Sequence, residues 1–249
     1  MENIENNLYR FYHQLTMAES VKGIRENGYE VAVAENDFWP RIIFNLDYSI
    51  EPEKLIPQIA AGFSEKNYTS FFIASDRFIT RNHSSVLKEN RIMPIKILKG
   101  MILSPEKKYE IETPSDIQIA ELKDYTQFVN FSNLVNSELM ASEMLFSPKL
   151  LTDINGCEKI KLFGLFSSKK LVSTLMVYTE PTNAGLYFIA TKKAFQKNGY
   201  ASILIKFVVN NLVGSGIKEV VLHANNFATG IYKKLGFEHK IDFVIYKML

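Results

Sequence analysis

The chain has 249 residues, of which 47% are hydrophobic and 22% charged, and its formal net charge is +2. This length fits one large or two ordinary domains with a buried core, and the composition is that of a soluble globular protein. A charge so close to zero gives no general electrostatic hold on nucleic acid, so we expect no nucleic-acid partner.

The single cysteine, Cys157, excludes an internal disulfide and fits a reducing compartment. The start of the chain is acidic and polar, without the apolar segment of a signal peptide. No stretch approaches about 18 consecutive apolar residues, the length that spans a bilayer. We therefore expect a cytoplasmic protein with no membrane segment.

Proline, charge and a Thr-Pro-Ser turn interrupt the apolar patterning near residues 104–114. A domain boundary there predicts an N-terminal α/β domain at residues 1–109 and a second domain at residues 110–249. In the first domain the patterning predicts strands at 29–34, 41–46, 70–75 and 92–103, and helices at 52–61 and 84–90. The turn at 47–51 is acidic and lacks glycine, which disfavours an anion. The aromatic segment 37–40 is either core or hinge, or a wall of a substrate site.

The second domain has a different order of elements. Helical spacing covers 121–140, and a polar turn joins predicted strands at 159–166 and 171–178 into a hairpin. A strand at 184–191 precedes a helix at 200–213, which Gly214 to Gly216 end. A strand at 218–223, a helix at 226–235 and a strand at 242–248 follow. This order predicts an α+β fold, in which helices flank a mixed, mostly antiparallel sheet. The first domain repeats part of this order in a degenerate form.

Two clusters of residues carry the chemistry. Gln196, Gly199 and Ala201 lie between a predicted strand and a predicted helix, where free backbone N–H groups can hold a pyrophosphate. The second cluster follows the next strand and comprises Asn225, Ala228, Tyr232, Gly236 and Phe237. A tyrosine on that helix can supply a proton near the far end of the same ligand.

Together these clusters resemble the GNAT superfamily of N-acetyltransferases over roughly residues 110–249. The family's phosphate loop reads Gln/Arg-x-x-Gly-x-Gly/Ala, and its next landmark reads Asn-x-x-Ala-x-x-x-Tyr-x-x-x-Gly-Phe; both match without a gap. The resemblance implies an acetyl-CoA-dependent N-acetyltransferase that acts on a primary amine of a small molecule or peptide by direct attack. It implies acetyl-CoA as co-substrate, no metal, and a first domain that covers the acceptor site. A homodimer is possible.

The resemblance also implies roles for individual residues. The pyrophosphate would lie on the turn formed by Gln196, Lys197, Asn198, Gly199, Tyr200, Ala201 and Ser202. The predicted strand at 184–191 would splay from its neighbour, and its backbone at Ile189, Ala190 and Thr191 would pair with the pantetheine amides. Asn225 would contact the cofactor or fix the loop. Tyr232 would protonate the leaving thiolate, because a phenol with a pKa near 10 keeps its proton at pH 7.

The general base does not follow from the family pattern. Members often carry a glutamate on the strand before the phosphate loop, and residues 184–191 contain no carboxylate. The candidates are Glu138, Glu143, Glu180, His223 or a water molecule. Lys192, Lys193 and Lys197 either screen the phosphates or form an ordinary solvated surface.

Two other functions remain open at this point. A non-catalytic acyl-CoA-binding regulator would keep the phosphate loop without a base. An aminoacyl transferase with paired folds of this type would take its donor from charged tRNA and would need a basic groove.

Overall fold

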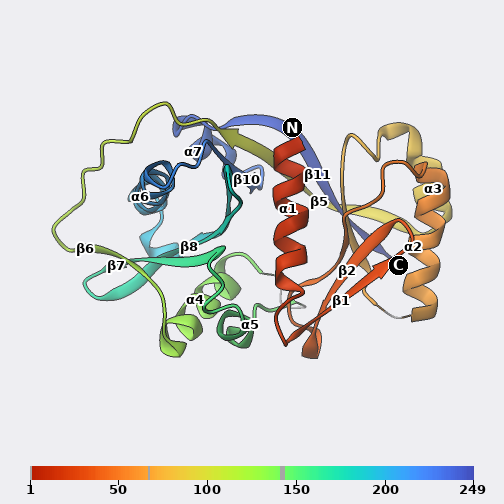
Figure 1. The fold of residues 1–249 in the computed structure, drawn as a ribbon, viewed down its shortest axis with the longest axis horizontal. Helices are drawn as coiled ribbons and strands as arrows, with labels where there is room; N and C mark the ends of the chain where they lie inside the picture. The colour runs from red at the N-terminus through yellow and green to blue at the C-terminus, as the bar shows by residue number, and fades with distance from the viewer. Residues whose placement is uncertain (1, 67, 141–143) are drawn as a thin grey trace.

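The structure is a computed structural model that describes residues 2–66, 68–140 and 144–249. Its eleven strands form one continuous sheet in the order β1-β2-β3-β4-β11-β5-β10-β9-β8-β7-β6. Helices cover both faces of this sheet, and α1 stands between its two ends (Figure 1). The sheet is mostly antiparallel, with parallel pairing between β3 and β4 and between β9 and β10. The α+β fold class expected from the sequence is confirmed.

The strands expected in the N-terminal part, residues 1–109, are present, together with two elements that the sequence analysis missed. Those two are α1 and β1. The elements are α1 (Glu2–Leu15), β1 (Val21–Glu26), β2 (Tyr29–Ala34), β3 (Arg41–Phe44), α2 (Pro52–Lys66), β4 (Phe71–Ser75), α3 (Ser84–Glu89) and β5 (Ile92–Leu103). Helix α1 is amphipathic and buries Ile4, Leu8 and Phe11 against the sheet.

The C-terminal part, residues 110–249, also follows the expected order, with β6 and α5 added. Its elements are β6 (Ile117–Glu121), α4 (Tyr125–Glu138), α5 (Pro148–Asp153), β7 (Ile160–Ser167), β8 (Lys170–Thr179), β9 (Asn183–Thr191), α6 (Tyr200–Gly214), β10 (Glu219–Ala224), α7 (Thr229–Lys234) and β11 (Glu238–Met248). Helix α4 begins at Asp124, whose carboxylate accepts a hydrogen bond of 2.9 Å from the Gln127 backbone N–H. Helix α7 begins later than predicted because Ala228 N–H is held in a turn by Asn225.

The last strand, β11, lies inside the N-terminal part of the sheet. It pairs with β4 from Phe243↔Ser75 to Lys247↔Phe71, and on its other edge with β5 from Glu238↔Ile102 to Met248↔Ile92. Strand β5 in turn pairs with β10 of the C-terminal part. Each part therefore contributes its last strand to the sheet of the other part.

Three large hydrophobic clusters of described residues fill the layers around the sheet, and a small fourth one comprises Leu134, Leu171 and Ala190. One face carries α1, α4 and α5, and its cluster includes Phe11, Phe131 and Phe243. On the opposite face, α6 and α7 cover the C-terminal part, while α2 and α3 cover the N-terminal part. The segment between β5 and β6 has no regular structure, and it is attached to α6 through reciprocal hydrogen bonds between Tyr109 and Asn210. The predicted boundary at 104–114 falls in this segment.

Candidate functional site

Strands β9 and β10 separate in the middle of the sheet. They pair in parallel from Asn183↔Glu219 to Leu186↔Leu222, and after that point β10 pairs only with β5. Phe188 lies in β9 just beyond the last pair, with a left-handed φ of 49°, opposite a register shift in β8. The rest of β9, up to Thr191, thus has one free edge. We call the gap between these strands the β9/β10 opening; it is the splay expected for this strand.

The β9–α6 loop, residues 192–199, ends in a row of free backbone donors. Among the described residues, the N–H groups from Lys197 to Ser202 have no hydrogen-bond acceptor. Lys197 and Gly199 have left-handed φ values of 66° and 78°, which direct the chain into the first turn of α6. A Cβ at Gly199 would meet no atom within 4 Å, so the local reason for glycine is this backbone conformation. Free N–H groups at a helix start form a ready anion-binding site.

Tyr232 lies on α7, the helix that follows β10. Its side chain is 8% exposed and packs in the cluster formed by α6, α7 and the sheet. Its ring meets Phe237 edge-on at 6.0 Å. Burial raises the pKa of the Tyr232 phenol to about 12. The hydroxyl therefore stays protonated at neutral pH, as a general acid requires.

Asn225 fixes the turn before α7. Its side-chain Oδ1 accepts a 2.9 Å hydrogen bond from the Ala228 N–H, and its backbone oxygen lies 3.1 Å from the same nitrogen. Asn225 therefore fixes this turn, and its expected contact with the cofactor or with the β9–α6 loop stays a prediction. The amide Nδ2 is not used in that turn and is left to donate elsewhere.

Glu180 is held by neighbours that oppose a role as general base. It accepts hydrogen bonds from Arg10 Nη1 at 2.7 Å and from the Tyr178 hydroxyl, and Lys159 Nζ lies 3.7 Å away. Burial pushes the pKa of Glu180 upward, but these hydrogen bonds outweigh it and the net shift is downward. Because Arg10 belongs to α1, Glu180 attaches that helix to the C-terminal part of the sheet.

His223 directly follows Leu222, the last residue of β10 that pairs with β9. Its ring stacks on Tyr187 at 6.0 Å and meets Phe243 edge-on at 4.9 Å. Burial lowers the pKa of His223 to about 3; the Ile4 backbone acts weakly in the opposite direction but does not reach hydrogen-bond geometry. Neither ring nitrogen has a hydrogen-bond partner among the described residues. This environment keeps the imidazole neutral and makes it a weak base.

Glu138 and Glu143 are the other two candidate bases. Glu138, the last residue of α4, accepts hydrogen bonds from the Lys193 backbone N–H at 3.1 Å and from Gln196 Nε2 at 3.3 Å. It therefore contacts the β9–α6 loop directly. Glu143 lies outside the described residues. The sequence analysis missed the loop contact because 55 residues separate Glu138 from Lys193 and no local pattern links them.

The aromatic segment 37–40 reaches the β9/β10 opening. Trp39 stacks on Phe146 at 5.3 Å and meets Phe188 edge-on at 4.8 Å. Phe11 of α1 stacks on Tyr187, the residue before Phe188, at 3.9 Å. The segment is thus packed into a cluster beside the opening, and the substrate-wall role remains a prediction.

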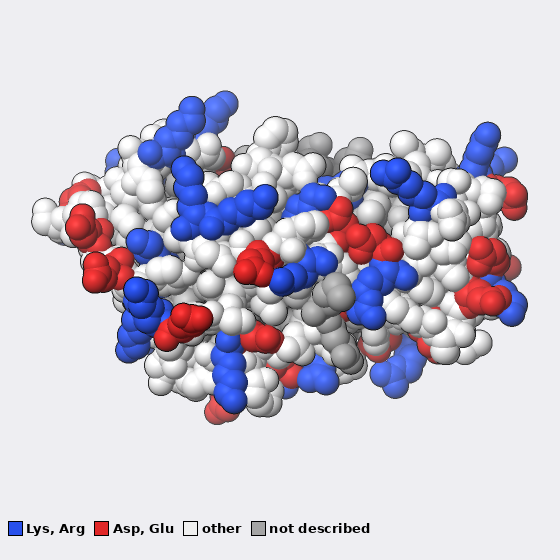
Figure 2. Space-filling model, turned by 90° about the horizontal axis from the view of Figure 1, so that it is seen from above, with Lys and Arg blue, Asp and Glu red and all other residues white. Residues whose placement is uncertain are grey.

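Surface charge is consistent with an anionic ligand on the α6 and α7 side. Figure 2 shows Lys and Arg side chains gathered over the part of the molecule where these helices lie. Lys192, Lys193 and Lys197 are exposed on the β9–α6 loop, and Lys233 and Lys234 are exposed at the end of α7.

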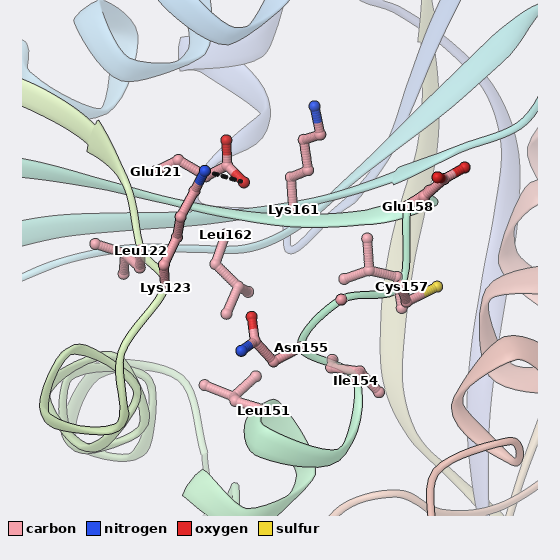
Figure 3. Close-up of a pocket in the computed structure, with 12 residues that line it drawn as sticks. Glu121, Leu122, Lys123, Leu151, Ile154, Asn155, Cys157, Glu158, Lys161 and Leu162 are labelled. Atoms are coloured by element: carbon pink, nitrogen blue, oxygen red, sulfur yellow. Dashed lines mark ion pairs between the residues drawn. The ribbon is translucent and has the colours of Figure 1, made fainter.

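A pocket of about 240 Å³ lies elsewhere, between β6, β7 and α5 (Figure 3). Leu122, Leu151 and Leu162 line its inner part, and Glu121 and Lys123 form an ion pair of 3.7 Å at its rim. It contains none of the residues predicted for the site.

Within the described ranges, no group of three or more His, Cys, Asp or Glu side chains is placed to hold a metal ion. None of the described helices combines the length and apolar character needed to cross a bilayer.

Comparisons with known proteins agree with this geometry. The family profile described as "Acetyltransferase (GNAT) domain" matches residues 127–244. No curated protein sequence matches the chain. Among solved structures, a GCN5-related N-acetyltransferase from Kribbella flavida is similar with a TM-score of 0.71 at 13% identity, over 99% of this chain and 94% of that one.

Two further structures share the fold over most of this chain. A GCN5-related N-acetyltransferase from Sphaerobacter thermophilus has a TM-score of 0.66 at 11% identity, covering 90% of this chain and 82% of that one. A tandem GNAT protein from the clavulanic acid biosynthesis pathway has a TM-score of 0.64 at 10% identity, covering 94% of this chain and 86% of that one. Identities this low show the fold, and that likeness includes the N-terminal part of the chain.

Proposed function

We propose that this protein transfers the acetyl group of acetyl-CoA to a primary amine, because residues 127–244 match the family profile described as "Acetyltransferase (GNAT) domain". The fold is that of an acyltransferase; the donor, the acceptor class and the residue roles are the proposal. The observation that carries it is the row of free backbone N–H groups from Lys197 to Ser202, at the start of α6 beside the β9/β10 opening.

These donors suit the pyrophosphate of coenzyme A. They point from the first turn of a 15-residue helix, whose N-terminus carries a partial positive charge. The free edge of β9 at Ile189, Ala190 and Thr191 offers backbone groups for the pantetheine amides. The thioester would then lie near the point where β9 and β10 separate, with Tyr232 on α7 close by.

The proposed reaction is a direct transfer. The neutral amine attacks the thioester carbonyl carbon, which forms the C–N bond and a tetrahedral oxyanion. Collapse of this intermediate breaks the C–S bond, and the thiolate takes a proton from the Tyr232 hydroxyl. The proton lost by the amine passes to water, because Glu180 is engaged by Arg10 and Tyr178 and His223 is a weak base in its buried site.

A non-catalytic acyl-CoA-binding protein is the second candidate. It is favoured by the same two residues, since neither Glu180 nor His223 has the environment of a strong base. An aminoacyl transferase that uses charged tRNA receives less support, because such a protein has no need of the free donors at the start of α6.

Acetyl-CoA binding tests the proposal. At about 100 times its dissociation constant the ligand should stabilise the fold by about 2.7 kcal/mol. For a chain of this size that corresponds to an increase in melting temperature of about 5–10 °C. Gly199→Glu should abolish the increase, because it places a carboxylate among the phosphate donors.

Gly216→Glu is the matched control. Gly216 also has a left-handed φ, 87°, and open space around its Cα, but it lies at the opposite end of α6. This variant should lose a similar amount of intrinsic stability and keep the response to acetyl-CoA. No shift in the parent protein at saturating acetyl-CoA would refute donor binding. A shift without release of free thiol across a panel of amines would favour the non-catalytic candidate.

A further inference from the structure

Glu138 connects the end of α4 to the β9–α6 loop through both of its carboxylate oxygens. Oε1 accepts from the Lys193 backbone N–H at 3.1 Å, and Oε2 accepts from Gln196 Nε2 at 3.3 Å. The same Gln196 nitrogen also donates to the Thr191 backbone oxygen at 3.0 Å. Glu138 and Gln196 therefore tie the last residue of β9, the loop and α4 together.

The first half of the loop is held by the Lys192 N–H, which donates to the Val172 backbone oxygen at 2.9 Å, and by packing of Phe195 against Tyr200. The second half, residues 196–199, is exposed and has fewer contacts. Lys192, Lys193, Gln196 and Lys197 are exposed, and no residue from 192 to 199 is fully buried. Lys197 also adopts a left-handed φ of 66°, which is unfavourable for a residue with a Cβ. A strained conformation of this kind persists only where the surroundings fix it.

The position of the carboxylate is itself unfavourable. Glu138 is the last residue of α4, where the helix carries a partial negative charge. Among the described residues, no lysine or arginine side chain forms an ion pair with it. The contacts with the loop are what compensate the charge, since hydrogen bonds to an ionised acceptor are stronger than neutral ones.

We propose that Glu138 is a positioning residue for the acyl donor: together with Gln196 it holds the β9–α6 loop in the conformation whose free N–H groups receive the pyrophosphate. This assignment rests on the proposed function. It differs from the general-base role, because both carboxylate oxygens are engaged by the loop and the residue acts on donor binding before any proton moves.

Three variants test the assignment. Glu138→Ala should raise the dissociation constant of acetyl-CoA about tenfold, measured by calorimetry, and raise the KM for acetyl-CoA similarly. It should leave kcat at saturating acetyl-CoA within about twofold of the parent, with the same pH profile. Glu138→Gln keeps an acceptor oxygen for Lys193 N–H and should restore most of the affinity. Gln196→Ala should weaken binding, and the double variant Glu138→Ala/Gln196→Ala should be weaker than the parent by less than the product of the two single effects.

Glu89→Ala is the matched control, because Glu89 is likewise the last residue of a helix, α3, in the N-terminal part. It should leave acetyl-CoA binding unchanged. Unfolding of each variant without ligand shows whether it is folded, and Gln196→Ala carries the test if Glu138→Ala is not, because parental affinity in Gln196→Ala would also overturn the positioning role.

The outcomes distinguish a failure of the proposed function from a failure of the positioning role of Glu138 alone. If the parent protein binds no acetyl-CoA, the proposed function fails and the positioning role fails with it. If the parent binds and Glu138→Ala binds equally well, the positioning role alone is overturned. A loss of kcat with unchanged KM, together with loss of the acidic limb of the pH profile, would also overturn it and make Glu138 the general base.

Discussion

The two parts of the sheet contain the same local arrangement with opposite contents. In the C-terminal part, parallel strands β9 and β10 separate after Leu186↔Leu222. In the N-terminal part, parallel strands β3 and β4 pair only at Ile43↔Phe72 and then separate. A helix follows the first strand in each case, α6 after β9 and α2 after β3. Only one of these two openings is suited to bind an anion.

The β3/β4 opening is filled by the protein's own side chains. Tyr48, which follows β3, donates to Glu5 Oε1 at 2.7 Å and lies 2.8 Å from the Ser75 hydroxyl at the end of β4. Tyr9 lies 3.1 Å from the same tyrosine oxygen, and Arg77 donates to Glu5 Oε2 at 2.6 Å. The polar groups of this opening satisfy one another.

The starts of α2 and α6 also differ in how far their polar groups are paired within the protein. Before α2, the Glu51 backbone oxygen accepts from Lys54 and Leu55, and the Asp47 carboxylate accepts from Ser49. Before α6, the N–H groups from Lys197 to Ser202 and the ring of His223 stay without acceptors or donors in the described part of the chain. The buried, unpaired ring of His223 calls for an explanation, whereas Lys197, Asn198 and Gly199 are exposed and their N–H groups are open to solvent or to an anion. The proposed donor site therefore lies at the β9/β10 opening, whereas the β3/β4 opening is held together by contacts within the protein.

The largest expected effect concerns whether the two parts can be separated. A fragment of residues 110–249 lacks β4 and β5, so that β11 loses both of its neighbours and β10 loses one. We expect this fragment to show no cooperative thermal unfolding by circular dichroism. Residues 1–109 and 110–249 produced together should associate and restore the transition, because the break falls in the irregular segment before β6. A cooperative transition for 110–249 alone would show that the two parts are independent domains.

The next effect compares one tyrosine from each opening. Tyr232→Phe keeps the packing against Phe237 and removes the proton donor, so kcat should fall on the order of 10²–10⁴-fold. The dissociation constant of acetyl-CoA should stay nearly unchanged, because the proton matters only as the thiolate departs. Tyr48→Phe removes a hydroxyl from the other opening and should leave kcat unchanged. Equal losses of kcat in the two variants would show that the two openings do not differ in catalysis. A parental kcat in Tyr232→Phe would exclude Tyr232 as the general acid.

Tyr48→Phe should instead lower stability. It removes the hydrogen bond to the Glu5 carboxylate and leaves the Ser75 hydroxyl without that partner. Such bonds contribute about 1.5–3 kcal/mol when one partner is charged. Urea unfolding should show a decrease of about that size, with acetyl-CoA affinity unaltered. An unchanged midpoint would mean that the network does not hold the β3/β4 opening together.

The smallest effect is a pH dependence from His223. Its folded pKa of about 3 lies below the ordinary value of 6.5, so the unfolded chain binds a proton that the folded chain does not. The contribution to stability is complete above pH 6.5 and falls as pH decreases toward 3, on the order of 1 kcal/mol per pH unit. His223→Phe should flatten this slope between pH 6.5 and 5, whereas Tyr48→Phe should keep it. An unchanged slope in His223→Phe would show that the imidazole is not desolvated.

The sequence predicted the elements that local patterning encodes. Strand β9, helix α6 and the turn with Gly199 follow from apolar periodicity and a glycine, and the structure contains them near the expected boundaries. Helix α1 was missed, although apolar residues such as Ile4, Leu8 and Phe11 recur in it at helical spacing and are buried. Its partners lie in β9, β10 and β5, far along the chain, and its charged residues interrupt the pattern.

The remaining differences are long-range. The position of β11 between β4 and β5 depends on hydrogen-bond register between distant segments, which no local signal specifies. The contact between Glu138 and the β9–α6 loop is equally non-local. The residues proposed to bind the donor were therefore readable from motif and spacing, whereas the residue proposed to position them was not.

The place of β11 also has a consequence for synthesis on the ribosome. This strand follows the other ten in the sequence, yet it lies between two strands of the N-terminal part. While the chain is being made, β4 and β5 each have an edge whose partner has not yet been translated. Unpaired edges of this kind are prone to pair with other chains. The nascent N-terminal part should accordingly depend on chaperones until its final strand leaves the exit tunnel.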